Sequence, residues 1–198
     1  MLCKRSNVNC IVHTGAAGSL GKFLVKLCKK EGINLINIVR RQSNVELLKS
    51  IGSEYILDCS TETFGKDMRT MFKKLKPMFF FDCVSGDLGT KIFSAMPAKS
   101  TTYVYGALDL KPYDIPAGEL LFTDKSLKGF WMSTFLQENP KLVPKLNEEV
   151  LKNLNAGDYK ITISKRFTPE EFEQAVEYYQ ENQSKGKVLL QTQAKPKL

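Results

Sequence analysis

Residues 14–21 of this chain read TGAAGSLG, and they stand between the apolar run CIVH (10–13) and the helix-like run KFLVKLCKKEG (22–32). Small residues at a turn from a strand into a helix let the backbone approach a pyrophosphate closely. The helix that follows presents free N–H groups and the positive end of its dipole to the same anion. This turn is therefore a candidate for binding a dinucleotide.

The spacing of the small residues supports that interpretation only in part. Ala16, Gly18 and Gly21 occupy the three positions of the G-x-G-x-x-G fingerprint, with alanine in place of the first glycine. Small residues at such a turn also serve close packing without any ligand. The turn alone leaves both interpretations open.

The rest of the chain alternates between strand-like and helix-like runs. Such alternation predicts a parallel sheet covered by helices on both faces, that is, an α/β fold with a Rossmann-type, doubly wound parallel sheet of six strands. After the first strand, the predicted strands are residues 35–39, 54–58, 78–84, 101–106 and 125–132, and further helices are predicted at 44–51, 67–75 and 90–96. The aromatic runs within the strands at 78–84 and 125–132 are predicted to lie mostly in the core.

The pattern changes after Trp131. A helix is predicted at 140–155 and a strand at 160–167, and Thr168 to Glu171 then form a capping box with proline at the first helical position. A last helix and a strand at 187–191 complete a C-terminal α+β appendage. The sequence thus predicts a Rossmann domain over residues 1–135 and an appendage over 136–198.

The end of the second predicted strand bears on the choice of cofactor. A unit that binds NAD carries an acidic residue there, which holds the ribose 2′-hydroxyl. This chain has Arg40 and Arg41 instead, and no carboxylate nearby. A guanidinium pairs with a 2′-phosphate that a carboxylate would repel, so the prediction is NADPH over NADH. The alternative is that both arginines are solvated loop residues.

Composition limits the other classes of function. The formal charge is +8, but the lysines are spread along the chain without a basic, aromatic-rich helix, so no nucleic-acid partner is predicted. No apolar run approaches the length that crosses a bilayer, so no membrane partner is predicted either. The five cysteines are scattered singly and no zinc-site spacing is present. Reduced thiols and the absence of a secretory signal in residues 1–10 predict a cytoplasmic protein, with the mitochondrial matrix as the other candidate compartment.

With these features in place, the chain resembles the medium-chain dehydrogenase/reductase superfamily, in its zinc-free quinone oxidoreductase and enoyl reductase branches. The resemblance runs from about residue 8 to about residue 191, and the order and spacing of the motifs carry it. The segments concerned are HTGAAGSLGKFLVKLCKKEG, IVRRQSNVELLKSIGSEYILD, FFFDCVSGD, VYGAL, LKGFWMSTFL and SKGKVLL.

The resemblance implies an NADPH-dependent reduction, by hydride transfer, of a small-molecule substrate with a carbonyl or a double bond conjugated to one. It implies no metal and no catalytic side chain in this chain. The resemblance places Gly18, Ser19, Leu20 and Gly21 at the pyrophosphate and Arg40 and Arg41 at the 2′-phosphate, with Thr14 and Ala16 as further cofactor-binding residues of the turn. It places Ser85, Gly106 and Ala107 along the dinucleotide, Phe130, Trp131 and Met132 at the nicotinamide, and Ser184 and Lys187 near the closing strand.

The chain departs from that superfamily in one large respect. Its members carry a β-rich N-terminal half, which supplies most of the substrate pocket, and here about eight residues precede the first strand. The late strands, which complete the sheet of that half in the superfamily, are expected to leave open edges and exposed apolar surface. A protein partner or a homo-oligomer is therefore predicted to cover them.

Two other classes of function remain open. A short-chain dehydrogenase would need a tyrosine with a lysine four residues later, and none of the seven tyrosines has one. An inactive, oxidoreductase-derived accessory subunit of a larger assembly is the second alternative, since a fold does not guarantee its chemistry. His13, Cys83 and Asp82 are assigned structural roles, His13 as a hydrogen-bonded core residue.

Overall fold

The computed structural model describes residues 8–192 of the chain. The N-terminal stretch interpreted above as lacking a secretory signal lies largely outside this range, as does Cys3. Cys10, Cys59 and Cys83 form no disulfide with the described residues, and Cys28 is buried.

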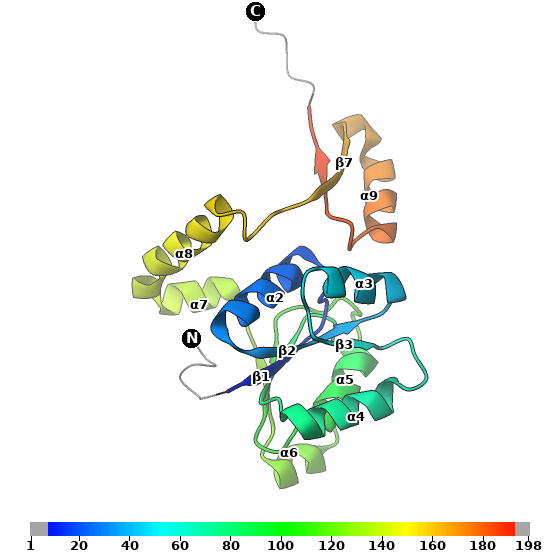
Figure 1. Ribbon diagram of the computed structural model, residues 1–198, viewed down its shortest axis with the longest axis vertical. Helices are drawn as coiled ribbons and strands as arrows, with labels where there is room; N and C mark the ends of the chain where they lie inside the picture. Colours follow the sequence, from blue (N-terminus) through cyan, green and yellow to red (C-terminus); the bar gives the residue numbers. More distant parts are fainter. Residues whose placement is uncertain (1–7, 193–198) are drawn as a thin grey trace, which may run out of the picture.

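A parallel sheet of six strands forms the larger part of the molecule, in the order β3-β2-β1-β4-β5-β6 (Figure 1). This is the strand order of the Rossmann fold, and it confirms the predicted fold class. The order reverses between β1 and β4, so the carboxyl ends of these two strands flank the place where such folds bind their ligands. The strands are β1 (Cys10–His13), β2 (Asn34–Val39), β3 (Tyr55–Asp58), β4 (Phe79–Asp82), β5 (Thr101–Val104) and β6 (Ser126–Gly129).

Helices cover both faces of this sheet. Figure 1 shows α2 and α3 on one face and α4, α5 and α6 on the other. Their bounds are α2 (Ser19–Glu31), α3 (Gln42–Ser50), α4 (Phe64–Leu75), α5 (Gly86–Ala95) and α6 (Ala117–Thr123). Two apolar clusters fill the spaces on either side of the sheet, because the strands are buried on both faces.

The C-terminal part forms a smaller unit, which confirms the predicted α+β appendage; its two strands pair in parallel in a sheet of their own. Helix α9 connects its two strands, and the unit stands on the side of α2 and α3 in Figure 1. Its elements are α7 (Met132–Glu138), η1 (Pro140–Leu142), α8 (Val143–Asn155), β7 (Ile163–Phe167), η2 (Pro169–Glu171), α9 (Phe172–Glu181) and β8 (Lys187–Leu190). The division of the chain at residue 135 stays a prediction.

Contacts between α2 and the end of α8 connect the two parts. Phe23 stacks on Tyr159 with ring centroids 4.8 Å apart, and the Lys30 ammonium lies 3.5 Å from the Asn153 side-chain oxygen.

The predicted capping box is confirmed, because the Thr168 side chain and the Glu171 side chain each accept a hydrogen bond from the other residue's backbone N–H.

The structure corrects the prediction around β6. The strand expected over 125–132 ends at Gly129, and Met132 instead begins α7, while α6 was not predicted at all. The aromatic residues of the GFWM run are exposed rather than in the core, with 74% of Trp131 accessible to solvent. A run of apolar residues indicates burial only when a second layer covers it. Phe130 contacts Phe135 of α7, but most of Trp131 and Met132 stays accessible to solvent. The aromatics of β4 do lie in the core, since Phe79 and Phe80 are buried.

Candidate functional site

The glycine turn joins β1 to α2 at the carboxyl edge of the sheet. Gly15 takes a left-handed conformation with φ of +66°, and a Cβ there would lie 2.5 Å from the Cys83 sulfur. Both facts require glycine at this position. The sharp bend thus falls on Gly15, one residue before Ala16, which the fingerprint places at the first glycine and which lies buried beneath the turn.

The N-terminus of α2 is open to an anion. Gly18 caps the helix without a side chain, and the first turn contains no acidic residue. The first-turn N–H groups therefore keep the hydrogen-bonding capacity and the positive dipole end that bind phosphates. Ser19 is partly exposed and Leu20 exposed beside them, whereas Gly21 is buried against the backbone of Ala16.

Thr14 fixes the start of this turn from inside the protein. Its hydroxyl donates to the Asp82 carboxylate at 2.5 Å and accepts a hydrogen bond from the Cys83 N–H at 3.0 Å. Thr14 is fully buried, so its side chain supports the turn. Its predicted role in cofactor binding stays a prediction.

The arginines at the end of β2 lie on the same edge of the sheet. Arg40 and Arg41 are exposed, and Arg41 precedes the first residue of α3. Within residues 8–192, neither guanidinium has an ion-pair partner or a hydrogen-bond partner. Their charges are therefore available to an incoming anion.

The loops after β4 and β5 are brought together beside the glycine turn. Ser85 is buried, and its hydroxyl donates to the Gly106 carbonyl at 3.1 Å. Ser85 also has φ of +69°, a conformation that costs a non-glycine residue free energy and is frequent at functional sites. Gly106 packs on Cys83, where a Cβ would come within 3.1 Å, and Ala107 is exposed next to it.

A groove of about 430 Å³ lies at the carboxyl end of β5 and β6. Phe130 and Trp131 line it, while Met132 is exposed at the start of α7. The other lining residues are Val104, Gly129, Thr134, Phe135 and Glu138. The aromatic side chains that were expected in the core thus form an accessible apolar wall.

Ser184 lies in the turn between α9 and β8 and Lys187 lies in β8, so both belong to the smaller unit rather than to this edge. Lys187 begins β8, and its backbone N–H donates to the Thr162 carbonyl. Among the described residues, neither side chain forms a hydrogen bond or ion pair with the glycine turn. Their role at the cofactor stays a prediction.

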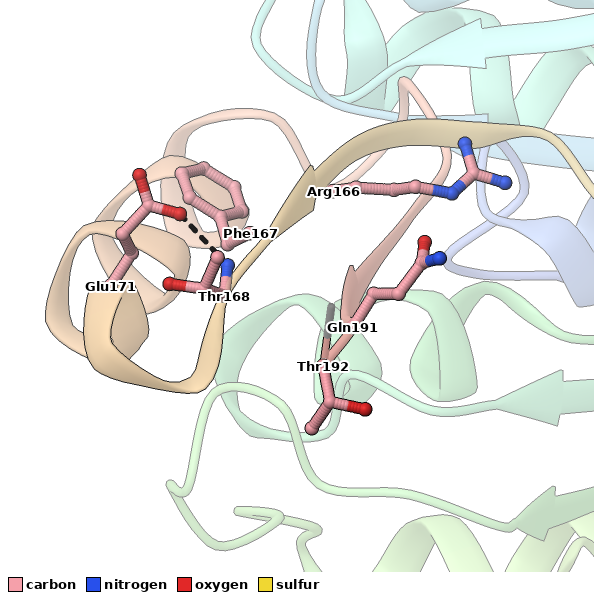
Figure 2. A pocket seen from close by; sticks show the side chains of 6 residues that line it. All are labelled: Arg166, Phe167, Thr168, Glu171, Gln191 and Thr192. Carbon is pink, nitrogen blue, oxygen red and sulfur yellow. Dashed lines mark hydrogen bonds between the residues drawn. The ribbon is translucent and has the colours of Figure 1, made fainter. Parts of the chain in front are cut away.

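A second hollow, of about 210 Å³, lies on the smaller unit (Figure 2). Figure 2 shows Arg166 and Gln191 extending on the same side of the two strands, while Phe167 and Glu171 turn toward α9. The remaining lining residues, Thr168 and Thr192, are small and polar. None of the site residues predicted from the sequence lines this hollow.

The ionisable groups near the glycine turn are held in non-reactive states. His13 is 1% exposed, and its Nε2 lies 2.5 Å from the Tyr105 hydroxyl. Burial lowers the pKa of His13 to about 4, against a smaller opposing effect of the Asp82 charge, so the ring is neutral at pH 7. Burial likewise raises the pKa of the Cys83 thiol. These findings confirm His13 as a hydrogen-bonded core residue and Cys83 as a thiol without activation.

Asp82 is the hydrogen-bonding centre of this region. It is 0% exposed and accepts from Thr14, from the backbone of Val84 and Ser85, and from the Tyr113 hydroxyl. Asp82 was expected to be a hydrogen-bonding residue at a strand end, and that expectation is confirmed. No local sequence pattern indicated Tyr113, which lies 31 positions from Asp82.

Two kinds of feature are absent from the described residues. Between residues 8 and 192, no group of three or more His, Cys, Asp or Glu side chains is arranged to hold a metal ion. No helix in the same range is long and apolar enough to cross a membrane.

The strand order, the glycine turn and the open N-terminus of α2 together define a dinucleotide-binding domain of the Rossmann type. The chain belongs to the zinc-binding dehydrogenase family, whose model matches residues 19–148, and its larger domain is the cofactor-binding domain of the medium-chain dehydrogenase/reductase superfamily. The family description names zinc, but the donors within the described part of the chain do not form a zinc site, since the single histidine is buried against Tyr105.

Two enoyl reductases show sequence similarity to this chain. The mitochondrial enoyl-[acyl-carrier-protein] reductase of Caenorhabditis elegans is 28% identical over 76% of this chain and 44% of its own length. The corresponding protein of Dictyostelium discoideum is 26% identical over 92% of the chain and 53% of its own length. The chain therefore spans about half the length of the curated relatives that it matches.

A solved structure shows the same arrangement of elements. A protein from Mesorhizobium loti, assigned as an NADPH:quinone reductase, superposes with a TM-score of 0.89 at 29% identity. The match covers 96% of this chain and 55% of that protein. The smaller two-stranded unit is thus included in the similarity.

Proposed function

We propose that this chain is the NADPH-binding part of an oxidoreductase that transfers hydride from the nicotinamide to a substrate with a carbonyl or a conjugated double bond. The observation that carries the proposal is the pair of guanidinium groups at the end of β2, which have no ion-pair or hydrogen-bond partner among the described residues and lie on the same edge as the glycine turn. The names of the relatives, enoyl and NADPH:quinone reductases, support the same class of reaction.

The residues of this chain would bind and orient the cofactor. The open N–H groups at Gly18 to Gly21 would hold the pyrophosphate, and Arg40 with Arg41 would hold the 2′-phosphate. Ser85, Gly106 and Ala107 would line the dinucleotide, and the wall of Phe130 and Trp131 would exclude water on the nicotinamide side. When bound, the nicotinamide supplies the hydride, and no side chain of this chain is assigned to proton transfer.

Calorimetric titration of the 198-residue chain with NADPH, and separately with NADH, tests the proposal. We expect micromolar binding of NADPH and weaker binding of NADH. Failure to bind either nucleotide would mean that the turn is only a packing feature. Binding of NADPH without reduction of any enone or quinone would instead favour the accessory-subunit alternative.

Arg40→Asp provides a sharper test of cofactor choice. It replaces a charge-assisted hydrogen bond by repulsion, so the affinity for NADPH should fall by about 100-fold while that for NADH changes little. Lys73→Asp is the matched control, because it makes the same charge change in the last turn of α4, which lies at the opposite edge of the sheet. Equal losses for both nucleotides in Arg40→Asp would argue against a 2′-phosphate role.

We also propose that another polypeptide segment covers the smaller unit in the functional protein. Ile163, Leu190 and Phe172 are exposed on the two strands and the connecting helix, with 56% of Phe172 accessible. Apolar surface of this kind marks an interaction site. Its occupant would be a partner chain, a further segment of a longer protein or a second copy.

That proposal predicts strong binding of a hydrophobic dye, or self-association measured by light scattering, for the chain on its own. Ile163→Lys together with Leu190→Lys should reduce either signal several-fold, since both changes place a charge on the apolar surface. A monomer with low dye fluorescence would contradict the proposal.

For the compartment, we propose the cytoplasm, and the names of the relatives support the mitochondrial matrix as the alternative. Imaging of a tagged chain distinguishes the two compartments.

A further inference from the structure

The connection between β5 and α6, residues 105–116, runs as a strap over the start of α5. Backbone hydrogen bonds fasten its first part, from Leu108 N–H to the Cys83 carbonyl at 3.0 Å and from Asp109 N–H to the Val84 carbonyl at 2.9 Å. Further along, the Asp114 N–H donates to the Thr90 hydroxyl at 3.0 Å. The strap includes Gly106 and Ala107, the two residues proposed to line the dinucleotide.

Tyr113 fastens the strap to the interior. Its hydroxyl donates to Oδ2 of the fully buried Asp82, and its ring packs on Gly89 of α5. A Cβ on Gly89 would lie 2.7 Å from the phenol carbon and oxygen, so only glycine leaves room for this ring. Burial raises the pKa of Tyr113, and its hydroxyl therefore remains protonated and able to donate across the physiological pH range.

Asp82 connects Tyr113 to the glycine turn. Thr14 donates to the other carboxylate oxygen, Oδ1, so one buried group joins two segments that are 99 positions apart. A buried carboxylate needs its hydrogen-bond donors, because leaving one of its positions unsatisfied carries a large desolvation cost. Loss of one donor therefore allows the carboxylate to reorient and loosens its remaining contacts.

We propose that Tyr113 is a positioning residue for the bound dinucleotide, which holds the strap at Gly106 and Ala107 in a fixed position relative to the glycine turn that begins at Thr14. The inference rests on the proposed function, since it assumes that both segments contact the same ligand. Tyr113 itself does not contact the cofactor in this proposal. It acts through Asp82 and through the backbone of the strap.

The test compares NADPH with adenosine 2′,5′-bisphosphate, which contains the 2′-phosphate and one phosphate of the pyrophosphate but lacks the nicotinamide half. Tyr113→Phe removes only the hydroxyl. It should weaken NADPH binding by about 10-fold, the size of one hydrogen bond to a charged group, and weaken the bisphosphate by less than about 3-fold. A general loss of folding would weaken both ligands equally.

Tyr159→Phe is the matched control. The Tyr159 hydroxyl forms no hydrogen bond with the described residues, and its ring stacks on Phe23 in the second turn of α2. Tyr159→Phe keeps this ring contact, so both ligands should bind as they do to the unsubstituted chain. Equal weakening of both ligands by Tyr113→Phe, or no weakening of NADPH, would overturn the positioning role. Failure of the unsubstituted chain to bind NADPH would overturn the proposed function and this role with it.

Discussion

Gly21→Ala should lower the free energy of unfolding by about 3 kcal/mol or more, as expected for forced overpacking between rigid elements. A Cβ at Gly21 would lie 2.5 Å from the Ala16 carbonyl carbon and 2.6 Å from its Cα, and closer still to the carbonyl oxygen. The overlapping atoms of Ala16 all belong to the backbone, so no side-chain rotation relieves the overlap. The α2 helix would have to move away from β1.

Urea denaturation of the two proteins measures this effect. The helical preference of alanine would by itself stabilise a helix by about 1 kcal/mol relative to glycine, so a loss of stability cannot come from propensity. Gly129→Ala is the control, since a Cβ there meets nothing within 4 Å. It should change stability by no more than about 0.5 kcal/mol. Similar values for both variants would contradict the close approach of α2 to the glycine turn.

A second large effect is expected from His13 as the pH falls. Burial lowers its pKa from 6.5 to about 4 in the folded protein. Between these values the unfolded chain binds more protons than the folded chain, so the stabilisation is present above pH 6.5 and is lost as the pH falls toward 4. The shift corresponds to about 3 kcal/mol of unfolding free energy over this range.

His13→Gln isolates this contribution, because the chain contains one histidine. The stability of the variant should fall less between pH 6.5 and 4 than that of the unsubstituted chain, with the difference approaching about 3 kcal/mol. Carboxyl groups that titrate near the lower limit are common to both proteins and cancel in the difference. Parallel pH dependences would show that His13 is accessible to protons in the folded state.

Much of the site follows from residues that are close together in the sequence. The small residues at 14–21, the arginines that follow β2 and the capping box at Thr168 each depend on a few consecutive positions. The structure confirms the fold class, the separate C-terminal sheet and the buried position of His13. It locates the sharp bend at Gly15, because the left-handed conformation and the contact with Cys83 both fall there.

The errors in the secondary structure predicted around β6 come from the limits of local sequence patterns. The run GFWM reads as a continuation of β6, because aromatic and apolar residues favour buried strands. In the structure this run passes beyond the sheet, where most of Trp131 is exposed, and α7 begins at Met132. Helices α6 and α7 have seven residues each, too few to show a clear helical period.

The sequence by itself determined the alternation of strands and helices, the phosphate-type turn and the absence of an acid after β2, since backbone preference and side-chain periodicity act over a few neighbouring residues. Only the tertiary structure decided which distant groups meet. The pairing of His13 with Tyr105 and the joining of Thr14 to Tyr113 through Asp82 bridge 92 and 99 positions. Such contacts depend on the order of strands in the sheet and on the packing of loops at its carboxyl edge, which no local pattern specifies.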